Sequence, residues 1–309
     1  MILALPILAA VSLVLILRWR PVDEGYMIAL VALTPFLALP LILADLVAWF
    51  SRMSAVRVMA AVVTVSYLAT VAPFDAVIGC QAETADDPIV VMTANVLKNG
   101  GRPETVAAEI VANDPDVVVM QEVRFDFAAA MDRQPGLDAW TFRSHRLPDA
   151  DNGVVVWSKW PATNVEFGTL NANSSVTATI ESPYGQFRLA GVHTLAPTSA
   201  RRAGIWNRQF VDLQTFPTDR PAVMAGDFNA TEDHHPFRTL LDQGWTDVHD
   251  NKGCGLDQTW PATRLPVPIM RLDHILVTDD FDVLSTEIGE PGGSDHFPVI
   301  SRMRLVSGD

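Results

Sequence analysis

The chain of 309 residues is 49% hydrophobic and carries 22 basic against 36 acidic side chains, a net charge of −14. Binding to duplex nucleic acid depends on Lys and Arg, so this charge disfavours a tight, unspecific hold on DNA, although a cleft filled by a metal ion could still admit a strand. The two cysteines lack the Cys/His spacing of a zinc site.

Three segments near the N-terminus are long and almost free of charge: residues 1–17, 26–50 and 58–74. A membrane-spanning helix needs about 17 to 25 mainly apolar residues, so we predict three transmembrane helices within residues 1–74. For the first segment the alternative is a cleaved signal peptide, but the chain begins without a basic region. For the other two the alternative is a buried helical hairpin.

The flanking charges predict the orientation of these helices. Basic residues are divided evenly between the two loops, but Arg52 and Arg57 precede the third segment and acidic residues follow it. We therefore expect a multi-pass protein of the cell membrane with everything after Phe74 on the extracytoplasmic side. Pro35 and Pro40 predict a kink in the second segment, which neighbouring helices tolerate.

A short acidic linker, residues 75–87, precedes a domain that we place at residues 88–309. This domain keeps 18 of the basic and 29 of the acidic side chains, because the first 87 residues hold only four and seven of them. Cys80 lies just beyond the third apolar segment and Cys254 in a polar loop. If the domain is exported, a disulfide between them is allowed.

Apolar runs of strand length alternate with a few helical patterns along the domain. Strands are expected at 89–94, 117–120, 154–157, 176–180, 187–192, from Ala222, and at 271–277, 281–288 and 297–303; helices are expected at 103–113 and 201–216. Many strands with a few interleaved helices predict an α/β fold of two packed sheets with helices on the outer faces.

Asp227 and Asn229 follow the apolar strand that begins at Ala222. On an extended segment, residues two positions apart point to the same side, so their polar groups would project together from the end of a buried strand. Burying them without partners is costly, so a metal ion, a phosphate or a water is expected beside them. An Asx turn that caps the strand is the alternative.

Other polar residues also stand at the ends of predicted strands: Asn95, Glu122, His193, Asp273, Asp295 and His296. The carboxylates and amides among them are hard oxygen ligands, which suit Mg²⁺ or Mn²⁺. The histidines supply donors or protons at neutral pH. Together these groups form the equipment for the attack of water on a phosphate ester.

Six motifs, in this order, resemble those of the endonuclease/exonuclease/phosphatase superfamily. They are Asn95 after a strand, Gln121-Glu122, the segment 191–197 (GVHTLAP), Gly226-Asp227-Phe228-Asn229, Arg271-Leu272-Asp273-His274 and Ser294-Asp295-His296. The likeness covers about residues 89–304. It implies a four-layered α/β sandwich and a metal-dependent phosphoesterase.

The resemblance also implies a role for each polar residue. Glu122 would be the principal metal ligand, and Asn95 and Asp295 would help to hold the ion and its waters. Asp227 would orient and deprotonate the attacking water. Asn229 would fix phosphate or water beside it.

On the substrate side, the resemblance implies that His296 contacts the phosphate and that Asp273 sets its tautomer. His193 would be a second donor to the phosphate or the acid for the leaving oxygen. Trp260 lies in a segment that resembles one placed beside the substrate, where it would stack on a base or headgroup; a core position is the more usual one for tryptophan. Leu97 departs from the base-excision nucleases, which have an acidic residue there, and this weakens the case for a second metal and for abasic-site chemistry.

Several further polar residues are expected to be structural. His234 and His235 follow the Asp227 loop, where a solvated loop or a helix cap is the simpler expectation. His274 is expected to be packed, because it is the strand neighbour of Asp273 and must face the other way. The arginines of the helix after His193 are expected on its surface: Arg201, Arg202 and Arg208.

These residues predict a membrane-anchored, magnesium-dependent hydrolase of a phosphate ester, in the first place a phosphodiester. The alternatives within this chemistry are an extracellular nuclease and a hydrolase of phospholipid or sphingomyelin headgroups. The alternative from another class is a membrane-anchored binding or sensing protein with an inactive site. No inert residue replaces any of the proposed catalytic ones, which argues against it. The expected partners are the substrate and the membrane.

Overall fold

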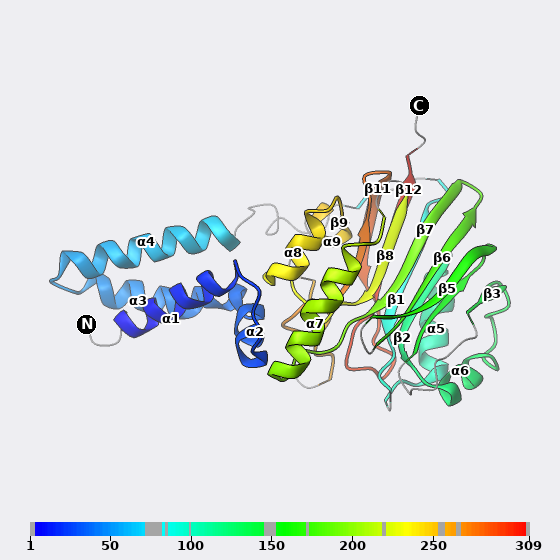
Figure 1. Cartoon of the computed structure of the whole chain (residues 1–309), viewed down its shortest axis with the longest axis horizontal. Coiled ribbons are helices and arrows are strands. Elements are labelled where there is room, and N and C mark those ends of the chain that lie inside the picture. The colour runs from blue at the N-terminus through cyan, green and yellow to red at the C-terminus, as the bar shows by residue number, and fades with distance from the viewer. Residues whose placement is uncertain are drawn as a thin grey trace.

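A computed structural model describes most of the chain and comprises an N-terminal group of helices and an α/β domain (Figure 1). The described residues are 4–71, 82–83, 86–98, 100–144, 153–170, 173–217, 221–252, 257–263 and 267–306. Cys80 and Cys254 lie outside them, so the disulfide between them stays a prediction.

The domain contains two six-stranded sheets. The first has the order β11-β12-β1-β2-β4-β3 and is made of β1 (Ile89–Asn95), β2 (Val117–Val123), β3 (Phe142–Arg143), β4 (Gly153–Ser158), β11 (Phe281–Ile288) and β12 (Val299–Leu305). The second has the order β5-β6-β7-β8-β10-β9 and is made of β5 (Ala162–Leu170), β6 (Asn173–Ser182), β7 (Gly185–His193), β8 (Ala222–Asp227), β9 (Thr246–Asp247) and β10 (Asp273–Val277). Among the described strand pairs, β1–β2 and β7–β8 are parallel and the others antiparallel.

The sheets face each other across the main core, in which Val91 and Val119 of the first sheet meet Val223 and Ile275 of the second. The strands at the centre of each sheet are apolar on both sides because helices cover their outer faces. These helices are α5 (Pro103–Asn113) and α6 (Phe125–Met131) on the first sheet, and α7 (Ala200–Leu213) and α8 (His235–Leu241) on the second (Figure 1). A short helix, α9 (Val248–Asn251), follows β9. The prediction of two packed mixed sheets flanked by helices is confirmed.

Three of the short or polar strands had no signal in the sequence. β5 pairs only with β6 at the margin of its sheet and carries Thr, Asn, Glu and Gly among its nine residues. Such a strand shows no apolar alternation, because neither of its faces is fully buried. β3 and β9, with two residues each, are too short for a periodic pattern.

The N-terminal helices correct the prediction of three transmembrane helices. They are α1 (Ala4–Leu17), α2 (Gly25–Ala32), the 3₁₀ turn η1 (Thr34–Leu37), α3 (Ala38–Trp49) and α4 (Ser54–Val71). Among the described residues, α4 alone is long and apolar enough to cross a membrane as one helix, and α1 has 14 residues. The segment predicted as one span at 26–50 is broken: α2 and the following η1–α3 segment meet at an angle of 66°. Only if both parts are counted as one bent helix would they make a second span. Three full spans are therefore not supported.

The break in the second segment has a physical cause. Pro35 lies in the 3₁₀ turn, where a proline removes a helical N–H. On the other side of the turn, Ile28 of α2 is 3% exposed and joins the apolar cluster of Trp206 and Phe237 on α7 and α8. α2 therefore packs on the domain instead of continuing the helical bundle.

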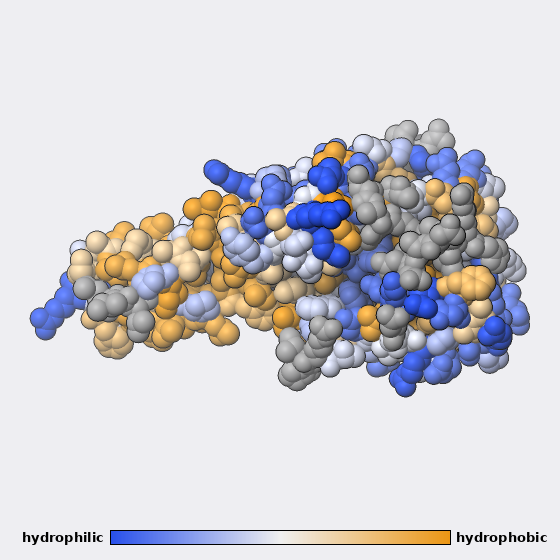
Figure 2. Space-filling model, turned by 60° about the horizontal axis from the view of Figure 1, so that its bottom comes forward, coloured by the Kyte–Doolittle hydropathy of each residue, from blue (hydrophilic) through white to orange (hydrophobic). Residues whose placement is uncertain are grey.

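The other helices pack on one another through small and apolar residues such as Leu8, Ala44 and Ala60. Their outward faces are apolar as well. Of the 26 exposed large apolar side chains among the described residues, 19 lie in residues 4–71. Figure 2 shows this as a hydrophobic surface over the bundle, beside a domain with a largely hydrophilic surface. An exposed apolar surface of this extent is typical of a region that contacts a membrane or another protein.

Candidate active site

The strand register brings the polar end residues to one edge of the two sheets. In the second sheet, Asp227 is level with His193 of β7 and with Asp273 of β10. In the first sheet, Asn95 ends β1 beside Gln121, one residue before Glu122. The two edges meet directly, because the Asn95 Nδ2 donates to Asp227 Oδ2 at 2.9 Å.

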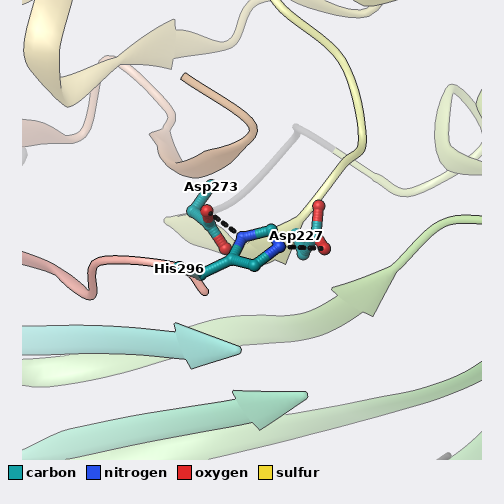
Figure 3. A group of neighbouring side chains, drawn as sticks. All are labelled: Asp227, Asp273 and His296. Atoms are coloured by element: carbon teal, nitrogen blue, oxygen red, sulfur yellow. Dashed lines mark hydrogen bonds and ion pairs between the residues drawn. The ribbon is translucent and has the colours of Figure 1, made fainter. Parts of the chain in front are cut away.

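His296 lies between two carboxylates (Figure 3). Its Nδ1 is 2.8 Å from Asp273 Oδ2, and its Nε2 is 3.9 Å from Asp227 Oδ2. Burial would lower the pKa of His296, but the attraction of Asp273 and Asp227 outweighs burial and raises this pKa to about 10. The imidazole is therefore a cation at neutral pH, with one N–H donated to Asp273 and the other directed toward Asp227.

Asp227 is 1% exposed, and burial raises the pKa of its carboxyl group while the neighbouring His296 and His193 oppose the shift. Its Oδ1 accepts the backbone N–H of Asn229 at 2.8 Å. The turn that allows this contact begins at Gly226, where a Cβ would lie 1.9 Å from the Val192 carbonyl oxygen. Asn229 itself has φ 47°, in the left-handed region that asparagine tolerates. The Asp-x-Asn segment is thus held in one tight turn.

Glu122 faces this group from the first sheet. Its Oε1 lies 3.9 Å from His193 Nε2, and its Oε2 accepts the backbone N–H of Lys98 at 2.8 Å. Glu122 has φ 60°, a left-handed conformation that is strained for a residue with a long side chain. Its side chain keeps 22% exposure, so it can reach a ligand that enters from solvent.

Asn95 presents its amide nitrogen to the site, because its Oδ1 accepts the Leu97 N–H at 3.0 Å. From this position the Nδ2 donates to Asp227 and, at 3.3 Å, to Glu122. In this arrangement Asn95 links the two carboxylates, whereas the sequence predicts that it helps to hold the metal. Leu97 has φ 53°, so the chain turns at this residue. It is the same position at which the base-excision nucleases have an acidic residue.

Asp295 and Trp260 adjoin the site. The indole N–H of Trp260 donates to Asp295 Oδ2 at 3.4 Å, and the Ala262 N–H donates to the Asp295 carbonyl at 2.8 Å. Trp260 therefore positions a predicted metal ligand. Its stacking on a substrate stays a prediction.

The donors at this edge fit a divalent cation. Asp227, Asp273 and His296 each offer a ligand atom within 4.8 Å of one another, but His296 is held as a cation by the two aspartates. Glu122 and Asp295 are the more accessible carboxylates, and magnesium usually takes one or two carboxylates together with waters. Within the described residues, Asp273 Oδ1 and His193 Nδ1 are buried and have no hydrogen-bond partner. The site therefore has unmet polar capacity for water, substrate or ion.

A second acidic group nearby is already paired with a cation. Arg271 lies 3.2 Å from Glu232, 3.8 Å from Asp247 and 3.3 Å from Asp250. His274 is 0% exposed and bonds to Asp247 from the face of β10 opposite to Asp273, so its predicted packing is confirmed. This group holds a guanidinium in place of a metal ion.

His234 is the N-cap residue of α8, as one of the two expectations has it, but its side chain makes no cap bond and is 4% exposed, so it is not solvated. Its Nδ1 accepts the Thr231 N–H at 2.8 Å, and its Nε2 lies 3.0 Å from the carbonyl oxygen of Ile28. Arg202, expected at the surface of α7, bonds to the Ala196 carbonyl at 2.7 Å. No sequence signal pointed to the contact of His234 with α2, because Ile28 is 206 positions from His234.

The sequence matches the model of the "Endonuclease/Exonuclease/phosphatase family" over residues 92–296. The chain belongs to the endonuclease/exonuclease/phosphatase family. All of the polar edge residues named above lie inside the match, from Asn95 to His296. No curated protein sequence matches the chain.

Solved structures of this family share the fold. A Bacteroides vulgatus endonuclease/exonuclease/phosphatase has 18% identity and a TM-score of 0.58, with 71% of this chain and 100% of that chain covered. D. rerio TDP2, determined with a single-strand DNA product, has 15% identity and a TM-score of 0.56 over 71% and 100% of the two chains. A mannosyl-6-phosphatase of Bacteroides thetaiotaomicron VPI-5482 has 15% identity and a TM-score of 0.54 over 70% and 100%. At these identities the likeness establishes the fold alone.

Proposed function

We propose that the domain is a Mg²⁺-dependent hydrolase that cleaves a phosphodiester by the attack of water. The observation that carries the proposal is the arrangement of Asp227, His296 and Asp273, with a buried carboxylate, an imidazolium and a second carboxylate in line. A site of this kind offers both a base for water and a fixed positive charge for a phosphoryl oxygen. Mn²⁺ is the second candidate ion.

Each residue has a part in this reaction. Asp227 takes the proton of the attacking water, and burial makes its carboxylate a stronger base than a free one. His296 stabilises the negative charge that grows on the phosphoryl oxygens, and Asp273 fixes its tautomer. His193 donates to the phosphate or protonates the leaving oxygen, and Asn229 holds phosphate or water.

The ion would be held by Glu122 and Asp295, and it would polarise the phosphoryl oxygens when bound. Trp260 keeps Asp295 in position for this. Asn95 keeps Glu122 and Asp227 at a fixed separation.

The substrate class follows less directly. D. rerio TDP2 was determined with a DNA product, and the Bacteroides thetaiotaomicron protein is a phosphatase of a sugar phosphate, so this fold alone does not choose a substrate. The acidic surface of this chain argues against a long polyanion. We favour a small phosphodiester or the headgroup of a lipid over an extracellular nucleic acid.

We further propose that residues 4–71 insert into a membrane. The exposed apolar side chains of the bundle support this, and aromatic residues flank it at both ends. Trp19 and Tyr26 lie at the turn into α2, beside the domain, whereas Trp49 and Phe50 end α3 at the far side (Figure 1). Fusions at the C-terminus test the extracytoplasmic orientation: alkaline phosphatase should be active and a cytoplasmic fluorescent protein dark. The reverse result places the domain in the cytoplasm.

The enzymatic proposal is tested with the full chain in detergent. Hydrolysis of bis(p-nitrophenyl) phosphate should require Mg²⁺ or Mn²⁺, stop with EDTA, and exceed that of p-nitrophenyl phosphate. Asp227→Asn is the matched inactive control. DNA, RNA, sphingomyelin, inositol phosphates and nucleotides then define the class. If the chain binds Mg²⁺ but hydrolyses none of these, a binding or sensing protein is the better description.

A further inference from the structure

The N-terminal helices contact the domain at the loops that follow two catalytic strands. Residues 194–199 follow His193 at the end of β7, and residues 228–234 follow Asp227 at the end of β8. α2 lies against α7 (Figure 1). Loop 194–199 leads directly into α7, and loop 228–234 leads directly into α8. The covalent connection is a different segment of the chain, the one between α4 and β1. The contact is therefore additional to a simple tether.

The loop 228–234 is held by a buried ion pair. The Arg18 Nε lies 2.7 Å from Asp233 Oδ1, and both side chains are 11% exposed. Arg238 donates to the carbonyls of Asp233, at 2.6 Å, and of Arg18. Removing one partner of a buried pair leaves an uncompensated charge, so the loss of Arg18 would leave Asp233 unpaired in the docked state.

The ring of His234 makes a second tie. Its Nδ1 accepts the Thr231 N–H within the loop, so its proton is on Nε2, which donates to the Ile28 carbonyl of α2. Burial lowers the pKa of His234 to about 4, and the ring is neutral at physiological pH. The neutral tautomer with its proton on Nε2 therefore makes both hydrogen bonds, one within loop 228–234 and one to α2.

The loop 194–199 is held by close backbone contact. A Cβ on Gly25 would lie 2.4 Å from the Pro197 carbonyl oxygen, so α2 begins directly on this loop. Asn207 of α7 donates to the carbonyl of Val22 at 3.0 Å and to Asp23 at 2.8 Å. No larger residue fits at position 25 without displacing the loop.

The two loops are also joined to each other beside the catalytic residues. The Asn229 side chain donates to the Thr194 carbonyl at 3.0 Å, and the Thr194 N–H donates to the Asp227 carbonyl at 2.9 Å. Thr194 also bonds through its hydroxyl to the Phe228 carbonyl. A shift of either loop therefore moves Asn229 and the carboxylate of Asp227.

We propose that the α1–α2 turn and α2 are a positioning element of the active site. Arg18 and the Ile28 carbonyl act through Asp233 and His234 to keep loop 228–234, and with it Asn229, in the reactive geometry. The inference rests on the proposed function of the site. It implies that the domain of residues 88–309 alone is a poor enzyme, although it contains every catalytic residue.

Arg18→Ala in the full chain tests this, and the exposed Arg20→Ala is the matched control. A displacement of about 1 Å at a reacting group can cost about 10²-fold in rate, so we expect Arg18→Ala to lower kcat for bis(p-nitrophenyl) phosphate about tenfold with KM unchanged. Arg20→Ala should stay within about twofold of the wild type, because surface substitutions have small effects. Arg18→Lys keeps the charge and should recover part of the loss.

His234 offers a matched pair of substitutions. His234→Asn keeps an acceptor for the Thr231 N–H and loses the reach to Ile28, whereas His234→Gln can still donate to the Ile28 carbonyl. The proposal expects the larger loss of kcat for His234→Asn. If His234→Asn is as active as wild type, α2 does not position the loop.

A double-mutant cycle separates positioning from general support. If Arg18 acts through Asn229, Arg18→Ala should cost about tenfold in the wild type and less than about twofold in Asn229→Ala, since residues that act together are not additive. Equal losses in both backgrounds overturn the proposal. Thermal unfolding of each variant confirms that the folded protein is being assayed.

Hydrogen exchange gives a readout that needs no turnover. Amides of residues 228–234 and 194–199 should exchange about tenfold faster in Arg18→Ala than in Arg20→Ala, because local opening becomes less costly. If Arg18→Ala changes neither the exchange rates nor kcat, the N-terminal helices do not position the loops, and the inference is overturned. If Arg18→Ala speeds exchange but the wild type hydrolyses no substrate, the N-terminal helices do hold the loops. In that case the proposed function is overturned instead. If Arg18→Ala does not fold, Arg18→Lys and the His234 pair carry the same comparison.

Discussion

Two buried histidines of the domain have opposite charge states. His296, at the catalytic edge, is 7% exposed and lies between two aspartates; His234, where α2 meets the domain, is 4% exposed and faces backbone groups and the ring of Trp206. Burial favours the neutral form of both. At His296 the attraction of the two carboxylates outweighs the effect of burial and raises the pKa to about 10. At His234 no neighbouring group outweighs burial, and the pKa is lowered to about 4. The charge of the neighbouring groups, more than burial, therefore decides that His296 is a cation in the active site and that His234 is a neutral ring with a structural role.

The largest effect on the catalytic side is expected from Asp227→Asn. This change removes the base for water and one of the charges that hold His296 as a cation, and it should lower kcat/KM by about 10² to 10⁴. Initial rates on bis(p-nitrophenyl) phosphate at saturating Mg²⁺ measure it. Asp282→Asn, which alters a surface carboxylate paired with Arg304, is the control and should have nearly wild-type rates. A small effect of Asp227→Asn would leave the site without a base.

The pairing of His296 with Asp273 is tested by the next largest effect. Asp273→Asn should lower kcat/KM about as much as His296→Ala, on the order of 10²-fold, because the imidazole is useful only while Asp273 orients and charges it. The double variant should be little worse than either single variant. If the two losses multiply, Asp273 acts independently of His296 and is a structural carboxylate at the start of β10.

The catalytic edge could be predicted from the sequence and the docking edge could not. Asn95 and Asp227 each end an apolar strand, and the parallel pairs β1–β2 and β7–β8 bring these ends level with Gln121 and His193. Asp273 begins β10, and the antiparallel pairing of β10 with β8 places this start beside Asp227. The orientation of the Asn95 amide was not predictable, because it depends on the turn at Leu97. His234 was invisible for a different reason: its partner Ile28 lies in an apolar segment that predicts a membrane helix equally well.

The two histidines also predict opposite pH dependence of stability. His234 has a lowered pKa, so the unfolded chain takes up a proton as the pH falls below 6.5 and the native ring does not until about pH 4. Stability is therefore lost as the pH falls through this window, by about 2 kcal/mol between pH 7.5 and pH 5. His296 has a raised pKa, so its contribution is complete below pH 6.5 and is lost as the pH rises to about 10.

Denaturant unfolding of the full chain in detergent at pH 7.5 and pH 5 checks the His234 contribution. The wild type should lose about 2 kcal/mol more than His234→Gln over this interval, since both share every other titrating group. An equal loss in the two proteins would mean that His234 is charged in the native state. The contrast with His296 would then disappear.

The smallest effect concerns the metal. Glu122→Gln keeps the size of the side chain but replaces a charged oxygen ligand by a neutral one, so Mg²⁺ affinity measured by titration calorimetry should fall about tenfold. His234→Gln changes a side chain that we place outside the metal site, and its Mg²⁺ affinity should equal that of the wild type. Because calorimetry requires no turnover, this comparison assigns the ligand independently of the substrate. Equal affinity of Glu122→Gln and the wild type would remove Glu122 from the metal site and leave Asp295 as the carboxylate that holds the ion.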